Sequence, residues 1–133
     1  MKPKTIALLH PGNMGATIGA AARAGGARVI WTSPGRTDAT RERAERAGLI
    51  DVGDLPAALA QSEVVLSICP PHAALSVAHE VAKTKFQGIY VDANAVSRST
   101  AEEIGRIVSQ GGASFIDGGI IGSPVKQAGT TRL

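Results

Sequence analysis

The fold of this chain is decided by the stretch Thr5-Ile6-Ala7-Leu8-Leu9-His10-Pro11-Gly12-Asn13-Met14-Gly15. An apolar run of strand length ends at a turn, and a helix of small residues begins directly after it. A turn of this kind lets backbone N–H groups approach an anion, and the positive end of the helix dipole faces the same point. The stretch therefore predicts a strand–turn–helix unit that binds a pyrophosphate.

The turn departs at one position from the G-x-G-x-x-G fingerprint of dinucleotide-binding units. His10 stands where the first glycine would be, and we interpret it as a loop residue rather than a catalytic group. Gly12 would let the backbone come close to the pyrophosphate, and Gly15 would let the helix pack on its strand. A tight turn without a ligand is the alternative. The position of the turn, between a first strand and a second one of suitable length, favours a dinucleotide.

Apolar, strand-like runs alternate with helical segments along the chain. The expected strands are 5–10, 27–32, 64–68, 89–91 and 113–116, and the expected helices are 13–24, 38–47, 55–61, 72–83 and about 99–110. Asp54 is expected to cap the helix 55–61, and the last helix is expected to begin at a capping box, Ser99-Thr100-Ala101-Glu102. This alternation predicts an α/β fold of the Rossmann type, with a doubly wound, mostly parallel sheet and helices on both faces.

Length and composition indicate one globular domain. The chain has 133 residues, of which 44% are hydrophobic and 19% charged, with a net charge of +3. No basic tract with interleaved aromatic residues occurs, so nucleic-acid binding is not expected. Cys69 is the single cysteine, which excludes an intramolecular disulfide and fits a reducing compartment. No apolar run nears membrane-spanning length, and no signal-peptide core is present, so we expect a cytoplasmic protein.

The residues after the second expected strand indicate which dinucleotide is bound. An NAD site would place Asp or Glu there, whereas this chain has Thr32-Ser33-Pro34-Gly35-Arg36-Thr37. A carboxylate would repel a 2′-phosphate, and a guanidinium would bind it by charge-assisted hydrogen bonds. We therefore predict NADP, held by Ser33, Arg36 and Thr37, with NAD the less favoured cofactor. An ordinary polar loop with a solvated arginine is the alternative.

Three later loops should open onto the same crevice, because ligands bind beyond the carboxyl ends of parallel strands. Cys69 and Pro70 follow one strand, and we interpret Cys69 as a small buried residue rather than a nucleophile. The candidate substrate contacts in the next two loops are Asn94, Ser97, Gly122 and Ser123. Turn chemistry without a ligand also explains such residues. The sequence shows no metal-ligand spacing and identifies no catalytic acid or base.

The stretch 8–15, the 33–37 loop, Val91-Asp92-Ala93-Asn94 and Phe115-Ile116-Asp117-Gly118-Gly119 together resemble one family. They are similar to the N-terminal domain of the 6-phosphogluconate dehydrogenase and β-hydroxyacid dehydrogenase superfamily, within an uncharacterised bacterial subgroup of NAD(P)-dependent oxidoreductases. The resemblance implies hydride transfer between nicotinamide and a hydroxy acid, a carbonyl or an imine. It also implies that Gly12, Asn13, Met14 and Gly15 hold the pyrophosphate, that Ser33, Arg36 and Thr37 hold the 2′-phosphate, and that Cys69 and Pro70 line the nicotinamide side.

The chain departs from this family in its substrate loops and its length. Asn94-Ala95 stand where the family has Ser-Thr, and Ile121-Gly122-Ser123 where it has Ser-Gly-Gly. Family members continue into a helical domain that supplies the catalytic lysine. We therefore expect an NADP-binding domain over 1–124, a truncated tail over 125–133 and little activity of the chain alone. We also expect self-association through the exposed apolar face that would meet the helical domain. A stand-alone, non-catalytic NADP-binding module is the alternative, and a domain for another nucleotide is a third.

Overall fold

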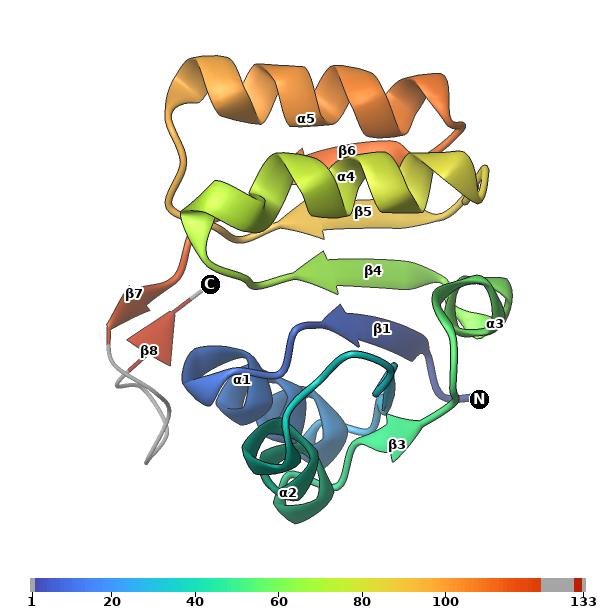
Figure 1. Ribbon diagram of the computed structural model, residues 1–133, viewed down its shortest axis with the longest axis vertical. Helices are drawn as coiled ribbons and strands as arrows, with labels where there is room; N and C mark the ends of the chain where they lie inside the picture. Colours follow the sequence, from blue (N-terminus) through green and yellow to red (C-terminus); the bar gives the residue numbers. More distant parts are fainter. Residues whose placement is uncertain (1, 123–130, 133) are drawn as a thin grey trace.

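The computed structural model describes residues 2–122 and 131–132 (Figure 1). A six-stranded sheet runs through its centre, with all neighbouring strands parallel and in the order β3-β2-β1-β4-β5-β6. The strands are β1 (Thr5–Leu9), β2 (Arg28–Trp31), β3 (Ile50–Asp51), β4 (Val64–Ser67), β5 (Ile89–Asp92) and β6 (Ser114–Asp117). The helices are α1 (Asn13–Ala24), α2 (Asp38–Arg46), α3 (Leu55–Gln61), α4 (Ala74–Lys83) and α5 (Arg98–Gln110), with a 3₁₀ turn over Pro71–Ala73.

This architecture confirms the predicted doubly wound α/β fold. Two short pairings were not expected from the sequence. β3 has only two residues, both exposed, so no apolar pattern marks it. A separate antiparallel pair joins β7 (Ile121–Gly122) to β8 (Thr131–Arg132). The predicted boundary between residues 124 and 125 lies outside the described residues.

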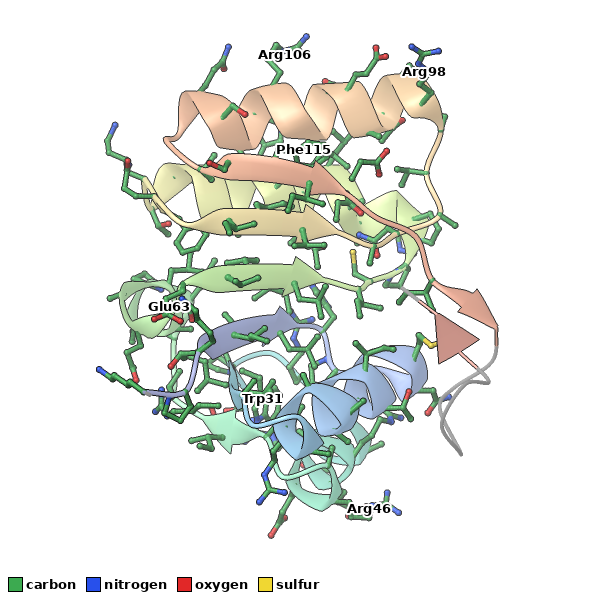
Figure 2. The ribbon with its side chains drawn as sticks, turned by 180° about the vertical axis from the view of Figure 1, so that it is seen from behind. Trp31, Arg46, Glu63, Arg98, Arg106 and Phe115 are labelled. Carbon is green, nitrogen blue, oxygen red and sulfur yellow. The ribbon has the colours of Figure 1, made fainter. Side chains whose placement is uncertain are left out.

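Two apolar layers hold the helices against the sheet. On one face, α4 and α5 pack on a core that includes Val65, Tyr90 and Ile104 (Figure 1). On the other face, the core includes Leu8 and Trp31 and lies beneath α1 and α2 (Figure 2). Strands that are buried on both faces need apolar residues at successive positions, which is why the predicted strands read as short continuous apolar runs.

The strand order places the site. β1 pairs with β2 on one side and with β4 on the other. From β1 the sheet therefore continues to β2 and β3 in one direction, and from β4 to β5 and β6 in the other. The loops that follow β1 and β4 therefore diverge at the carboxyl edge of the sheet. This topological switch point is where open α/β sheets bind their ligands.

The sequence predicted the cap of one helix correctly and the cap of another wrongly. Thr37 caps α2 and Asp54 caps α3 through their side-chain oxygens, and the Asp54 cap was expected. The predicted capping box at Ser99 is wrong. The hydroxyl of Ser97 accepts the Thr100 N–H at 3.2 Å, so α5 begins two residues earlier than that box requires.

One part of the sheet, the side of β5 and β6 opposite α4 and α5, has no helix over it among the described residues. Figure 2 shows β5 and β6 from this side, with α4 and α5 behind them. Ile89 is 39% exposed and Ile116 is 50% exposed. Separately, none of the helices in the described part of the chain has the length and apolar character needed to cross a membrane.

Candidate functional site

The turn between β1 and α1 is shaped to hold an anion. Gly12 is the N-cap of α1, and no described side chain caps this helix, so its first N–H groups lack intrahelical partners. A Cβ added at Gly12 would meet no described atom within 4 Å, which leaves the turn open. A Cβ at Gly15 would lie 2.9 Å from the His10 carbonyl oxygen, so the close approach of helix and strand requires glycine there. The turn therefore fits the pyrophosphate of a dinucleotide.

A cavity of about 320 Å³, called here the turn cavity, opens at the switch point. It brings together most of the residues predicted to bind the cofactor. They are Gly12, Asn13, Met14 and Gly15 from the turn, Arg36 from the loop after β2, and Cys69 and Pro70 after β4. These segments are far apart in the sequence and meet because β1 is the neighbour of both β2 and β4.

A second cavity of about 390 Å³, called here the loop cavity, lies beside the first. Thr32, Pro34 and Arg36 line one side of it, and Leu55 and Val77 are among the residues that line the other. A mostly apolar slot with a few polar groups suits a flat heteroaromatic ring such as adenine. Together the two cavities provide space for both ends of a dinucleotide.

The loop after β2 is a tight turn that presents Arg36. The Arg36 N–H donates to the Ser33 carbonyl at 2.9 Å, and Gly35 has a φ of 78°. Pro34 followed by such a glycine is typical of a type II turn. The Thr37 hydroxyl accepts the Thr40 N–H at 3.2 Å as the cap of α2. Of the loop residues that the structure describes, Ser33 and Thr37 line neither cavity, whereas Arg36 lines both.

Sequence reasoning missed an acid near this loop. Asp51, at the end of β3, accepts the Ser33 N–H at 3.3 Å and the Gly53 N–H at 3.0 Å. Burial alone would raise the pKa of Asp51, but hydrogen bonds from Ser33 and Gly53 and the charge of Arg41 together lower it. No local pattern could have found this contact, because Asp51 lies 18 residues beyond Ser33.

His10 takes an unusual backbone conformation and pairs with Arg36. Its φ is 62°, in the left-handed region that residues with side chains seldom adopt. Its Nε2 lies 3.1 Å from Nη2 of Arg36. Burial, and secondly the charge of Arg36, lower the pKa of His10 to about 4, so the ring is neutral near pH 7.

A buried polar cluster lies where β4 and β5 end. The side-chain oxygen of Asn94 accepts the Cys69 N–H at 2.7 Å, and its amide nitrogen donates to the Ser67 hydroxyl at 3.1 Å. Asp92 Oδ1 accepts the Asn94 N–H at 2.8 Å, while its other oxygen and the Tyr90 hydroxyl have no partner among the described residues. Asn94 is 7% exposed, so the structure places it as a tie between two loops.

Burial controls the ionisation of this cluster. It raises the pKa of Asp92, and the charge of Asp117 acts in the same direction. It also raises the pKa of the Cys69 thiol, which keeps the sulfur protonated near neutral pH. The thiol is therefore a poor nucleophile, in line with the interpretation of Cys69 from the sequence.

The remaining substrate candidates do not form one group in the described structure. Ser97 lies at the start of α5 with its hydroxyl used as the cap. Gly122 belongs to the β7–β8 pair. Ser123 lies outside the described residues.

Known proteins resemble this chain in sequence and in fold. Residues 5–96 match the family described as NADP oxidoreductase, coenzyme F420-dependent. No curated protein sequence matches the chain. Solved structures also match the chain, and those described below are covered over less than half of their own length.

One of these structures, a conserved protein of unknown function described as similar to 3-hydroxyacid dehydrogenases, is 26% identical with a TM-score of 0.79, over 90% of this chain and 44% of that one. The 3-hydroxyisobutyrate dehydrogenase of Mycobacterium tuberculosis is 23% identical with a TM-score of 0.81, over 92% and 42%. A variant imine reductase of Myxococcus stipitatus in complex with NAD+ is 20% identical with a TM-score of 0.76, over 93% and 43%. The chain thus spans about two fifths of the length of these proteins.

Proposed function

Because the chain belongs to the family of NADP oxidoreductases described as coenzyme F420-dependent, we propose that it is the NADP-binding part of an oxidoreductase. It binds NADP(H) in preference to NAD(H) and serves hydride transfer to or from a small hydroxy acid, carbonyl or imine. Family membership establishes that the chain is an oxidoreductase domain of a kind that binds a pyridine nucleotide. The preference for NADP, the substrate class and the activity are the proposal.

The position of Arg36 carries the proposed preference. Its side chain lines both the turn cavity and the loop cavity, between the two ends of a bound dinucleotide. A guanidinium offers paired donors to a phosphate and keeps its charge at any physiological pH. The nearby carboxylate of Asp51 is engaged by the N–H groups of Ser33 and Gly53. A 2′-phosphate therefore meets a cation directly after β2, as NADP requires and NAD does not.

The turn after β1 and the loop after β4 bind the rest of the cofactor, its pyrophosphate and its nicotinamide. Gly12, Asn13, Met14 and Gly15 hold the pyrophosphate, with Gly12 leaving room and the start of α1 supplying N–H groups. Cys69 and Pro70 line the nicotinamide side. The nicotinamide, when bound, donates or accepts the hydride. Ser33 and Thr37 support the loop that carries Arg36.

The first experiment tests the role of Arg36. We expect Arg36→Ala to weaken NADPH binding about tenfold to a hundredfold, because hydrogen bonds to charged groups contribute roughly 1.5–3 kcal/mol. NADH binding should change by less than about threefold, since NADH has no 2′-phosphate. Titrations followed by nicotinamide fluorescence measure both affinities.

Arg106→Ala is the matched control. Arg106 lies on α5 and points away from the sheet, at the far end of the molecule from α1 and α2 (Figure 2). The Arg106→Ala substitution removes the same charge as Arg36→Ala and should leave the affinities for NADPH and NADH unchanged. An NADPH/NADH affinity ratio that stays the same in Arg36→Ala would refute the proposed preference.

Activity separates the oxidoreductase from a non-catalytic NADP-binding module. NADPH oxidation is assayed with panels of aldehydes, keto acids and imines, using the chain alone and the chain together with a helical C-terminal domain of its family. Turnover in the presence of the second domain supports the enzyme, and binding without any turnover favours the module.

We propose that Asn94, Ser97, Gly122 and Ser123 border the substrate.

We further propose a cytoplasmic location, which the single, half-buried and protonated Cys69 supports. We also propose self-association through the uncovered face of β5 and β6, which the exposure of Ile89 and Ile116 supports.

A further inference from the structure

Neither the fingerprint nor the proposed function accounts for His10 in the turn after β1. A non-glycine residue with a φ of 62° carries a conformational cost, and glycine at this position would remove it. Such outliers persist where the surrounding structure holds them in place, and they concentrate at ligand sites. The contacts of the ring show what holds His10 and what the ring does.

The contact with Arg36 has only one chemical form. A guanidinium donates hydrogen bonds and accepts none, so Nε2 of His10 is the acceptor in the 3.1 Å contact with Nη2. The ring proton then lies on Nδ1. The low pKa of His10 agrees with this neutral form, because a protonated ring could not accept and would repel the guanidinium.

The pair of His10 and Arg36 lies at the junction of the two cavities. His10 and Arg36 each line both the turn cavity and the loop cavity, so the hydrogen bond lies where the two cavities meet. His10 uses one of the five N–H donors of the guanidinium and leaves the others for a ligand. Arg36 sits in a turn that is itself tied by its N–H to Ser33, so His10 supplies a separate restraint on the side chain.

We propose that His10 is a positioning residue that holds the Arg36 side chain ready for the 2′-phosphate and thereby sets the preference for NADP. This inference rests on the proposed binding of NADP. Its physical basis is preorganisation, since immobilising a long side chain at the moment of binding costs affinity. Without the acceptor on His10, Arg36 is free to leave the junction of the cavities, and only the ligand that needs Arg36 loses affinity.

The test compares two substitutions of similar bulk at His10. His10→Phe removes the acceptor and keeps an aromatic ring, whereas His10→Gln keeps a side-chain oxygen with a comparable reach. We expect His10→Phe to weaken NADPH binding about threefold to tenfold, the equivalent of one ordered side chain, and to leave NADH binding within about twofold. His10→Gln should restore most of the NADPH affinity.

A second background shows whether His10 acts through Arg36. In Arg36→Ala, the His10→Phe substitution should no longer change NADPH affinity, because the partner is absent. Equal weakening of NADPH and NADH by His10→Phe, or the same weakening in both backgrounds, would overturn the inference and assign His10 to the shape of the turn. An unchanged affinity ratio in Arg36→Ala refutes the proposed NADP preference instead, so the two failures are distinguishable.

A measurement on the unmodified chain covers the case in which His10→Phe does not fold. Imidazole ¹⁵N chemical shifts at pH 7.5 should identify His10 as neutral with its proton on Nδ1. Addition of 2′-AMP should shift these signals more than addition of 5′-AMP, because the 2′-phosphate engages the partner of the ring. A proton on Nε2, or equal responses to the two nucleotides, would contradict the inference.

Discussion

At the scale of single residues, Gly12 and Gly15 are glycines for two different physical reasons. Gly15 is required by the protein, because a Cβ there would lie 2.9 Å from the carbonyl oxygen of His10. Gly12 has an ordinary φ of −71° and open space around its Cα. None of the described residues would contact a Cβ at Gly12, which supports the proposal that the ligand requires glycine there.

Alanine at each position separates the two roles. We expect Gly15→Ala to lower the free energy of unfolding by about 1–3 kcal/mol, because the added methyl group overpacks a tight contact. Gly12→Ala should change it by less than about 1 kcal/mol, the range of a modest N-cap change, yet weaken NADPH binding more than tenfold. Urea unfolding and fluorescence titration measure the two quantities. Unchanged NADPH binding by a folded Gly12→Ala chain would mean that the cofactor does not approach this position.

At the scale of elements, α5 shows how a cap decides where a helix begins. The chain offers Ser97, Ser99 and Thr100 in close succession, and each has a hydroxyl that could serve. Ser97 takes the role because its backbone is extended, with a ψ of 159°, and its oxygen reaches the Thr100 N–H. The pair of Arg98 and Glu102, at 3.1 Å, lies on the exposed first turn and contributes at most about 1 kcal/mol.

Substitution of the two serines tests this assignment. Ser97→Ala should lower the free energy of unfolding by about 1 kcal/mol through loss of the cap. Ser99→Ala should change it by less than about 0.5 kcal/mol, as expected for a surface position. Thermal and urea unfolding provide the comparison. Equal losses in both variants would restore the capping box at Ser99 that the sequence predicted.

At the scale of the whole molecule, the two faces of the sheet are covered unequally. Helices α4 and α5 cover β5 and β6 on one side (Figure 2), where Tyr90 belongs to the core and Phe115 packs against it. Ile89 and Ile116 are the sequence neighbours of these two residues, so they face the other side, where they are exposed. Apolar surface on a sheet face gains free energy when it is buried, at roughly 25 cal/mol for each Å² removed from water. This surface is the basis of the proposed self-association.

A charge on this face should reduce the association. We expect the chain to show concentration-dependent dimers in sedimentation velocity, and Ile116→Lys to shift it toward the monomer. Ile50→Lys is the control, because Ile50 is 45% exposed but lies on β3, at the opposite edge of the sheet. A chain that stays monomeric at high concentration, or an equal effect of both lysines, would count against this face as the interface.

The sequence by itself determined the α/β class and the turn after β1, and it predicted cofactor-binding segments that largely line the turn cavity. These features depend on apolar runs, glycine spacing and polar caps. Each of these involves only a few neighbouring residues and can therefore be recognised in the sequence. The Asp54 cap and the strand–turn–helix unit at Gly12 were predicted for this reason.

The tertiary structure alone decided how these segments cooperate. It brought His10 to Arg36 across 26 residues, Asn94 to Cys69 across 25, and Asp51 to Ser33 across 18. It also placed Ile89 and Ile116 on an exposed face of β5 and β6. Such contacts depend on which strands become neighbours, and strand neighbours are chosen by the burial of the whole sheet rather than by any local pattern.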